Sequence, residues 1–179
     1  MRKFLVLLPL LVLPVSAWAQ QSQTPLVEVF GGYSNLTANF SQTNFILNGY
    51  TVSAQENLNS WFGGAVDFSE HIGTDNRFKV NTESMMYGPV FSYRKSRVIT
   101  PFAHGLLGAV RGGPEYLNIS KSEYHFGAYA GGGLDLNVGH GLALRLIQAD
   151  YLYTHFSNFR QNNLRLSAGI VLLLGTKKK

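Results

Sequence analysis

Hydrophobic and polar residues alternate with a period of two along most of this chain. In residues 163–174, for example, Leu164 and Leu166 fall on one face, while Arg165 and Ser167 fall on the other. Successive side chains of a strand point to opposite faces of a sheet, so the alternation predicts strands. Past the first twenty residues, no apolar run approaches the ~20 residues that a transmembrane helix needs.

Eight segments carry this pattern and are bounded by Gly, Asn, Pro or Ser. We predict strands at Leu26–Ser34, Asn48–Leu58, Trp61–Glu70, Val80–Arg94, Thr100–Arg111, Glu123–Asn137, Leu142–Thr154 and Asn163–Leu174. Most match the ~9–11 residues that a tilted strand needs to cross a bilayer. The second face of these strands carries charged and small polar residues, which suit the lumen of a membrane barrel. The sequence therefore predicts an all-β fold, an eight-stranded antiparallel up-and-down transmembrane β-barrel.

The predicted connections alternate between long and short. Long connections are expected at 35–47, 71–79, 112–122 and 155–162, and short ones at Asn59–Ser60, Lys95–Ile99 and Val138–Gly141. Outer-membrane barrels have short periplasmic turns and longer external loops, so this order puts the N-terminus of the barrel in the periplasm. The loop segments Asn39–Asn44 and Pro114–Ser120 are then candidate contacts for an unknown surface ligand.

The inward faces of the predicted strands carry charged residues. They are Glu28, Asp67, Arg94, Asp135, Arg145, Asp150 and Arg165. An eight-stranded barrel is just wide enough for side chains to fill its lumen, and buried charges must pair. We therefore predict a structural charge network in the lumen. Asp150 and Gln148 share a face with Arg145 only if a β-bulge near Ile147 adds one residue.

The N-terminus reads as a secretory signal. Arg2 and Lys3 precede the apolar stretch Phe4–Val15, and Ala17-Trp18-Ala19 supplies the small-x-small pattern of a cleavage site. This predicts a signal peptide at 1–19 and an outer-membrane barrel domain at 20–179. The chain contains no cysteine, so no disulfide framework is expected.

Charge and histidine spacing exclude other classes of function. Fifteen Lys and Arg face ten Asp and Glu, but five of the basic residues lie at the two chain ends. The body is neutral and shows no basic cluster, so we expect no nucleic-acid partner. The five histidines show no pairing typical of a metal site, and we expect neither metal nor cofactor. The expected partners are outer-membrane lipid and lipopolysaccharide around a monomer.

Several segments resemble the small outer-membrane β-barrel family that includes the membrane domain of outer-membrane protein A, within the wider porin-like superfamily. The opening strand at 27–34 (VEVFGGYS) and the closing strand at 163–170 (NLRLSAGI) resemble those of the family. Residues 131–135 (GGGLD) and 144–151 resemble its sixth and seventh strands. The resemblance implies an outer-membrane location and the barrel fold, and it says little about activity.

Two alternatives stay open. Residues 154–158 (THFSN) resemble the His-x-Ser-Asn motif of lipid A deacylases, which would make His155 the base and Ser157 the nucleophile. The carboxylate that this motif expects is missing, because no Asp or Glu follows Asp150. A soluble periplasmic lipid-carrying barrel is the other alternative, and it requires an apolar lumen. We favour a non-enzymatic envelope protein of the cell outer membrane with a structural or surface-interaction role.

Overall fold

The structure is a computed structural model. It describes residues 24–40, 43–75, 78–116, 119–120, 123–156 and 159–176, and within these the side chains outside 38–45, 74–79, 112–124 and 154–162. The predicted signal peptide lies outside the described residues and stays a prediction. Among the described residues, no helix has the length and apolarity required to cross a membrane.

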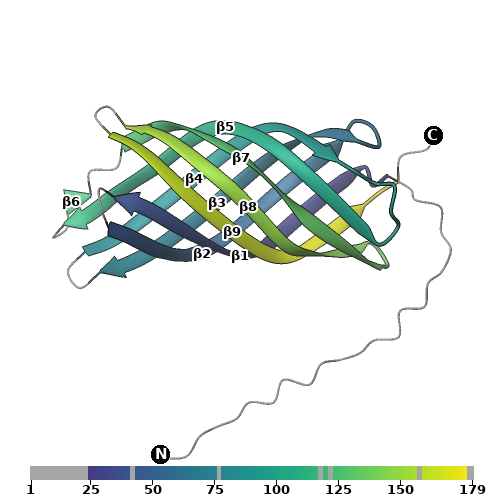
Figure 1. Ribbon diagram of the computed structural model, residues 1–179, viewed down its shortest axis with the longest axis horizontal. Helices are drawn as coiled ribbons and strands as arrows, with labels where there is room; N and C mark the ends of the chain where they lie inside the picture. The colour runs from purple at the N-terminus through teal and green to yellow at the C-terminus, as the bar shows by residue number, and fades with distance from the viewer. Residues whose placement is uncertain are drawn as a thin grey trace, which may run out of the picture.

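Eight long strands and one very short strand make up the described part of the chain (Figure 1). They are β1 (Val27–Phe40), β2 (Thr43–Asn57), β3 (Phe62–Asp75), β4 (Phe78–Ser92), β5 (Ile99–Tyr116), β6 (Ile119–Ser120), β7 (Glu123–Gly139), β8 (Leu142–Phe156) and β9 (Phe159–Leu174). Every pairing is antiparallel, and each of the eight long strands contains most of one predicted segment.

The sheet closes on itself. Its order is β4-β3-β2-β1-β9-β8-β7-β5-β6, and an additional β4–β5 pairing joins the two edges of the long-strand sheet. The two-residue β6 pairs only with the end of β5. The prediction of an eight-stranded antiparallel barrel is therefore confirmed. Closure leaves no open edge among the long strands, so backbone groups are satisfied by neighbouring strands.

The two ends of the barrel differ. One end, which we call the terminal end, contains Pro25 and Gly175. It also contains the connections at 58–61, 93–98 and 140–141. The opposite end, where β1–β2, β3–β4, β5–β7 and β8–β9 turn back, is the hairpin end. The tight turn between β7 and β8 has positive φ at Gly139, His140 and Gly141.

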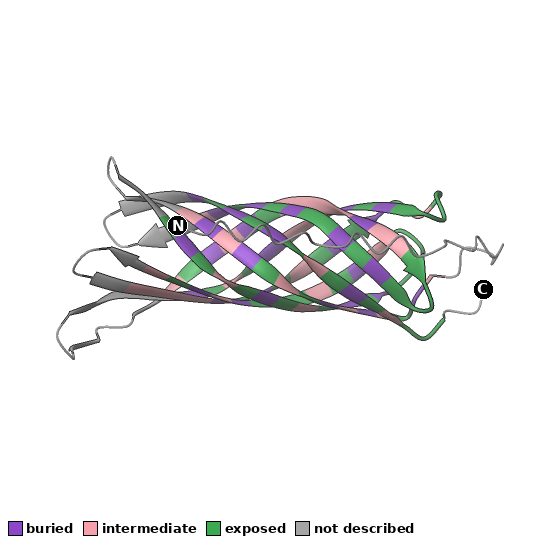
Figure 2. Ribbon diagram, turned by 90° about the horizontal axis from the view of Figure 1, so that it is seen from below, coloured by how far each residue is buried: buried purple, intermediate pink, exposed green. Residues whose placement is uncertain are grey.

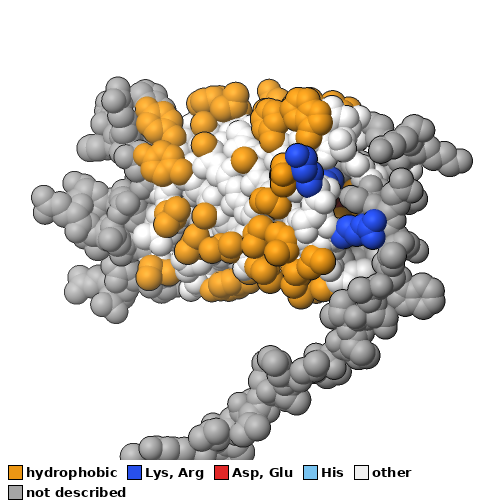
Figure 3. Space-filling model, turned by 45° about the vertical axis from the view of Figure 1, so that its right-hand side comes forward, with side chains coloured by type: hydrophobic (Ala, Val, Ile, Leu, Met, Phe, Trp, Pro, Cys, Tyr) orange, Lys and Arg blue, Asp and Glu red, His pale blue; other side chains and the backbone are white. Residues whose placement is uncertain are grey.

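Buried and more exposed residues alternate over much of the long strands, as Figure 2 shows for the visible side of the barrel. The outward face is apolar: Tyr33, Tyr87 and Met85 are among its most exposed large side chains. Space-filling Figure 3 shows such side chains spread over the body of the barrel. This outward face argues against the soluble lipid-carrying alternative, because water-compatible residues would be required there.

On β1 to β5, polar side chains interrupt the apolar outward band towards the hairpin end, and exposed Ile46 lies beyond them. We call Asn35, Asn48, Glu70, Asn81, Glu83 and Arg111 the polar ring. Tyr33 and Tyr50 at its edge donate hydroxyl hydrogen bonds of 2.6 and 2.7 Å to Asn48 and Glu70. Amphipathic Tyr is enriched at membrane interfaces, so the ring marks one boundary of the membrane-spanning band.

The prediction of long connections at the hairpin end is wrong. The register runs on from Asn35↔Asn48 to Phe40↔Thr43, and from Ile72↔Asn81 to Asp75↔Phe78. Likewise β5 continues to Tyr116, and β8 pairs with β9 as far as Phe156↔Phe159. Most of the described residues in these predicted loops therefore belong to paired strands that continue past the polar ring.

The bulge predicted near Ile147 is present in β8. Leu134 of β7 pairs with Ile147, while Asp135 pairs with Arg145. Leu146 is therefore an extra residue in β8 with no partner on β7. Leu146 and Ile147 are neighbours in sequence and both are exposed. Because two consecutive residues point outward, Arg145 and Gln148 both point into the lumen.

Candidate functional site: the lumen charge network

All seven charged residues predicted for the lumen point inward and are enclosed. Six of them are less than 7% exposed, and the side chain of the seventh, Arg94, is 10% exposed. They form three groups along the barrel, each built around one arginine. Four carboxylates in these groups face three guanidinium groups, and a histidine supplies a further polar partner.

The first group lies at the terminal end, where β1 begins. Arg94, just beyond β4, donates to a Glu28 carboxylate oxygen at 2.5 Å and to the Asn57 amide oxygen at 3.1 Å. Asn57 in turn donates to Glu28 at 2.8 Å and accepts from Gln55. The chain entry before β1 is fixed as well, because Asn57 also donates to the Pro25 carbonyl.

The second group is a bidentate ion pair between neighbouring strands. Arg145 donates through Nε and Nη2 to the two carboxylate oxygens of Asp135 at 2.8 and 3.0 Å. Its guanidinium lies between two aromatic rings, 4.3 Å from the Phe30 centroid and 4.1 Å from the Phe102 centroid. Planar guanidinium groups favour both contacts at once, so this arginine is held in a single orientation.

The third group lies at the centre of the lumen and spans it. Arg165 on β9 reaches Asp67 on β3 at 2.7 Å and Asp150 on β8 at 2.7 Å. The Arg165 side chain is fully buried, and its guanidinium lies 4.3 Å from the Tyr129 ring centroid. One side chain therefore joins strands from distant parts of the barrel wall.

Two further residues, Gln148 and His104, contact these groups. The sequence analysis had not given either of them a functional role. Gln148 accepts from Arg145 at 2.7 Å and donates to Asp150 at 2.7 Å. His104 Nε2 lies 2.7 Å from the other Asp150 oxygen. A polar chain thus runs from Asp135 to Asp67 through alternating donors and acceptors, which strengthen one another in a low-dielectric interior.

A layer of hydroxyl groups continues this chain. His71 Nε2 lies 2.8 Å from the Ser34 hydroxyl, which is 2.9 Å from that of Ser167. Ser69 and Ser84 are 2.8 Å apart, and Ser84 also contacts the Tyr129 hydroxyl. The sequence signal for His71 and His104 was their inward strand parity, but parity alone did not reveal their partners.

The lumen also contains an apolar layer that the sequence analysis did not predict. Its buried members are Leu36, Leu47, Met86, Leu106, Val110, Tyr129 and Leu152. A smaller cluster of Phe30, Ala143 and Val171 lies near the terminal end. The filling is therefore mixed, with charged groups between apolar ones, and both kinds of side chain occupy the space within the wall.

The described lumen charges pair with one another and form hydrogen bonds. No group of three or more His, Asp or Glu among the described residues could hold a metal ion. The weak catalytic pair falls elsewhere: Ser157 and the side chain of His155 lie outside the described residues. The backbone of His155 is opposite that of Arg160, so its strand neighbour is not an acid.

Comparison with known proteins places this geometry in a family. A family model described as "Outer membrane protein beta-barrel domain" matches residues 5–171. No curated protein sequence matches the chain.

Solved structures share the fold at low sequence identity. Neisserial surface protein A is 15% identical with a TM-score of 0.67, and the match covers 83% of this chain and 97% of that one. Ail, the attachment invasion locus protein of Yersinia pestis, is 19% identical with a TM-score of 0.59, and the match covers 83% and 99%. The N-terminal barrel of Pseudomonas aeruginosa OprF is 12% identical with a TM-score of 0.51, over 84% and 100%. The closed barrel and the match over most of its length show that this chain belongs to the outer-membrane β-barrel domain family of Gram-negative bacteria and resides in the cell outer membrane.

Proposed function

We propose that this protein is a non-enzymatic, non-conducting scaffold that presents its hairpin end at the cell surface. The observation that carries the proposal is the burial of Arg165, whose side chain has no exposed surface although it lies in the lumen of the barrel. A water-filled pore would leave such a group hydrated. The bidentate Arg145–Asp135 pair lies nearer the terminal end and fills the lumen there as well.

The hairpin end is the part that would meet a surface ligand. Its strands continue past the polar ring, so they stand beyond the membrane-spanning band rather than within it. The earlier candidate segments Asn39–Asn44 and Pro114–Ser120 fall here, and their side chains lie outside the described residues. The described backbone of these segments is paired, so it has less conformational freedom than a long loop would have.

The composition of the hairpin end favours an uncharged ligand. The segments 38–45, 74–79, 112–124 and 154–162 contain four Lys or Arg and three Asp or Glu, which nearly cancel. They also carry aromatic residues among Asn, Ser and Thr, including Phe40, Phe45, Tyr116 and Phe156. Rigid aromatic rings with adaptable amide and hydroxyl groups are the usual components of binding loops.

Ail of Yersinia pestis has been crystallised with the heparin analogue sucrose octasulfate. That ligand is polyanionic, and the balanced charge at this hairpin end does not favour a similar one. We therefore propose that the surface partner here is recognised through aromatic and amide contacts.

The test has an orientation arm and a binding arm. An epitope tag inserted between residues 41 and 42 should be labelled by antibody on intact cells, whereas the same tag between 96 and 97 should be labelled only after permeabilisation. Cells carrying a variant with residues 40–43 replaced by Gly and Ser should then lose binding to an array of uncharged glycans. Labelling of the 96–97 tag on intact cells, or unchanged array binding by the variant with residues 40–43 replaced, contradicts the proposal.

The deacylase alternative is tested separately. We expect no release of fatty acid when the purified barrel is incubated with lipid A in detergent micelles. Release that disappears in Ser157→Ala would establish the alternative and overturn the non-enzymatic part of the proposal.

A further inference from the structure

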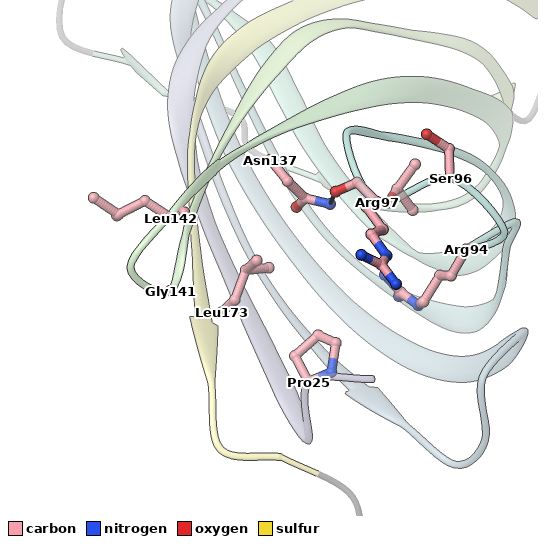
Figure 4. A pocket seen from close by; sticks show the side chains of 10 residues that line it. Pro25, Arg94, Ser96, Arg97, Asn137, Gly141, Leu142 and Leu173 are labelled. Carbon is pink, nitrogen blue, oxygen red and sulfur yellow. Dashed lines mark hydrogen bonds between the residues drawn. The ribbon is translucent and has the colours of Figure 1, made fainter. Parts of the chain in front are cut away.

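A small cavity opens at the terminal end of the barrel, beneath the turn that joins β4 to β5. Its volume is about 160 Å³. Figure 4 shows the side chains of Arg94 and Arg97 reaching into it from this turn, with Asn137 on one side. The volume equals that of about five water molecules, which suits a small polar group.

The charge of the cavity is one-sided. Two arginines line it and no carboxylate does. Arg94 is already engaged by Glu28, but the Arg97 guanidinium has no ion-pair partner among the described residues. An exposed guanidinium directed towards a second arginine is a binding feature for an anion with several oxygens.

The turn that carries Arg97 is fixed in place. The Ser96 hydroxyl accepts hydrogen bonds from the backbone N–H groups of Val98 and Ile99, both at 3.2 Å. Asn137 donates from its amide to the Arg97 carbonyl at 3.1 Å. These bonds hold the backbone of the turn against β7. The backbone around Arg97 therefore loses little further conformational entropy when an anion binds.

The surroundings point to the membrane interface. Trp61 stacks on Phe91 with centroids 6.0 Å apart, and the Trp61 carbonyl accepts from the Ser92 N–H at the end of β4. Exposed Tyr93 follows, with the Lys95 ammonium 5.5 Å from its ring centroid. Such an aromatic cluster lies at headgroup level in membrane barrels, so the adjoining turn is at that level too. Figure 3 shows Lys and Arg gathered at this end of the visible face.

Apolar side chains form the opposite wall of the cavity. Pro25 and Leu173 face the arginines across it, and partly exposed Leu142 lies at the rim where β8 begins (Figure 4). A ligand with an anionic group and an adjoining apolar part fits both walls. We propose that this cavity binds a phosphate group, as carried by the headgroup of an anionic phospholipid in the leaflet at the terminal end.

The experiment compares lipid retention by the full chain in nanodiscs of equal parts phosphatidylglycerol and phosphatidylcholine. Native mass spectrometry of the released barrel reports which lipid is co-retained. The wild-type protein should retain phosphatidylglycerol in preference to phosphatidylcholine. Arg97→Gln should reduce this preference about tenfold, as expected for one lost charge-assisted contact. Lys95→Gln, which removes the same charge from the same turn outside the cavity, should change it less than twofold.

A second arm separates the two sources of phosphate. Glycerol 1-phosphate is titrated into the barrel in neutral phosphatidylcholine nanodiscs, and the side-chain amide signal of Asn137 is followed by NMR. If the Asn137 signal shifts only when Arg97 is present, but the first arm shows no preference for phosphatidylglycerol, the site binds phosphate. The proposal that the phosphate comes from a lipid is then overturned. Equal losses in Arg97→Gln and Lys95→Gln, or no preference and no shift in the wild type, overturn the site. A heat-dependent gel shift confirms that each variant is folded.

Discussion

Each lumen arginine satisfies more than one neighbour, and this makes each of them hard to replace. Arg165 bridges two aspartates on different strands and packs on Tyr129. Arg145 binds one aspartate twice and lies between two aromatic rings. Removing one partner of a buried pair leaves an uncompensated charge, which costs more than the pair contributes as a whole. The stability of the barrel should therefore depend strongly on a few single side chains.

Arg165→Gln should lower the free energy of unfolding by about 3–5 kcal/mol, because Asp67 and Asp150 would remain buried without their cation. Urea titration in detergent micelles, followed by the gel shift of the unheated protein, measures the change. The matched control is Arg111→Gln in the polar ring, whose ion pair with Glu83 is 40% and 35% exposed. An exposed pair of this kind contributes about 0–1 kcal/mol.

The double variant Arg165→Gln with Asp67→Asn should recover part of the loss, since one buried carboxylate is then neutral. If Arg165→Gln destabilises the barrel no more than Arg111→Gln does, the lumen network has no structural role.

A glycine beside Asp150 allows the central group to form. A Cβ at Gly131 would lie 2.2 Å from the Asp150 carboxylate oxygen and 2.4 Å from the Ala149 carbonyl oxygen. Gly131→Ala should therefore cost about 1–3 kcal/mol through overpacking. The control is Gly31→Ala, where a Cβ would meet nothing within 4 Å. Equal urea midpoints for the two variants would show that Asp150 can move without loss.

At the scale of elements, the bulge in β8 determines which residues reach the network. Without the extra residue, the strand beyond it would turn over, and Gln148, Asp150 and Leu152 would face the lipid. The bulge therefore brings Asp150 onto the same side of the wall as Arg145 and Asp135. Its two outward residues, Leu146 and Ile147, are apolar as their position at the membrane surface requires.

Deletion of Ile147 should abolish assembly of the barrel, because it exposes buried polar groups of β8 to lipid or breaks the β8–β9 register. The expected result is no heat-modifiable band in outer-membrane fractions. Ile147→Ala keeps the residue count and should assemble normally. A deletion variant that assembles to wild-type levels would mean that the register can shift without cost.

Strand positions could be predicted because inward and outward residues differ so clearly in chemistry. The bulge was also predictable, since Arg145 and Gln148 are both polar yet three positions apart, which an unbroken strand cannot place on one face. The strand extensions at the hairpin end were not predictable in this way. In these segments the sequence lacks a clear period-two contrast between apolar and polar residues, so it resembles a loop.

Partners across the lumen could not be derived from sequence. The Arg165–Asp67 contact joins β9 to β3, and it depends on the tilt and stagger of the strands rather than on sequence spacing. His104 has inward strand parity, but nothing in the sequence indicated Asp150 as its partner. Two members of the apolar layer, Leu36 and Leu47, lie in what looked like a loop, and its other members fall on inward strand positions that were expected to be polar.

For the whole molecule, the filled lumen and the apolar outer band together define what the barrel can do. Charged groups and an apolar layer occupy the interior in series, so an ion would have to pass both kinds of barrier. Under the proposed function the working surfaces are the two ends, with the hairpin end and the cavity at the terminal end on opposite sides of the membrane.

We expect the barrel in planar lipid bilayers to give a conductance equal to that of lipid alone at moderate voltage. The reason is that the narrow lumen is closed by paired side chains in at least two places along its axis. A double variant, Arg165→Ala with Arg145→Ala, removes both closures and should conduct if it folds. Stable single-channel steps from the wild type would contradict the scaffold role.

The burial of Arg165 has a consequence for how the chain reaches this state. Its partners lie on β3, early in the chain, and on β8, immediately before its own strand, while β9 must also pair with β1 to close the seam. The seam joins residues separated by most of the sequence, so it carries a large loop-closure cost and is expected to form late. Until that moment Asp67 has no arginine partner. Neutralisation of Asp67 and closure of the seam are therefore one event, and an arrested intermediate would be an open sheet in which Asp67 carries an unpaired negative charge.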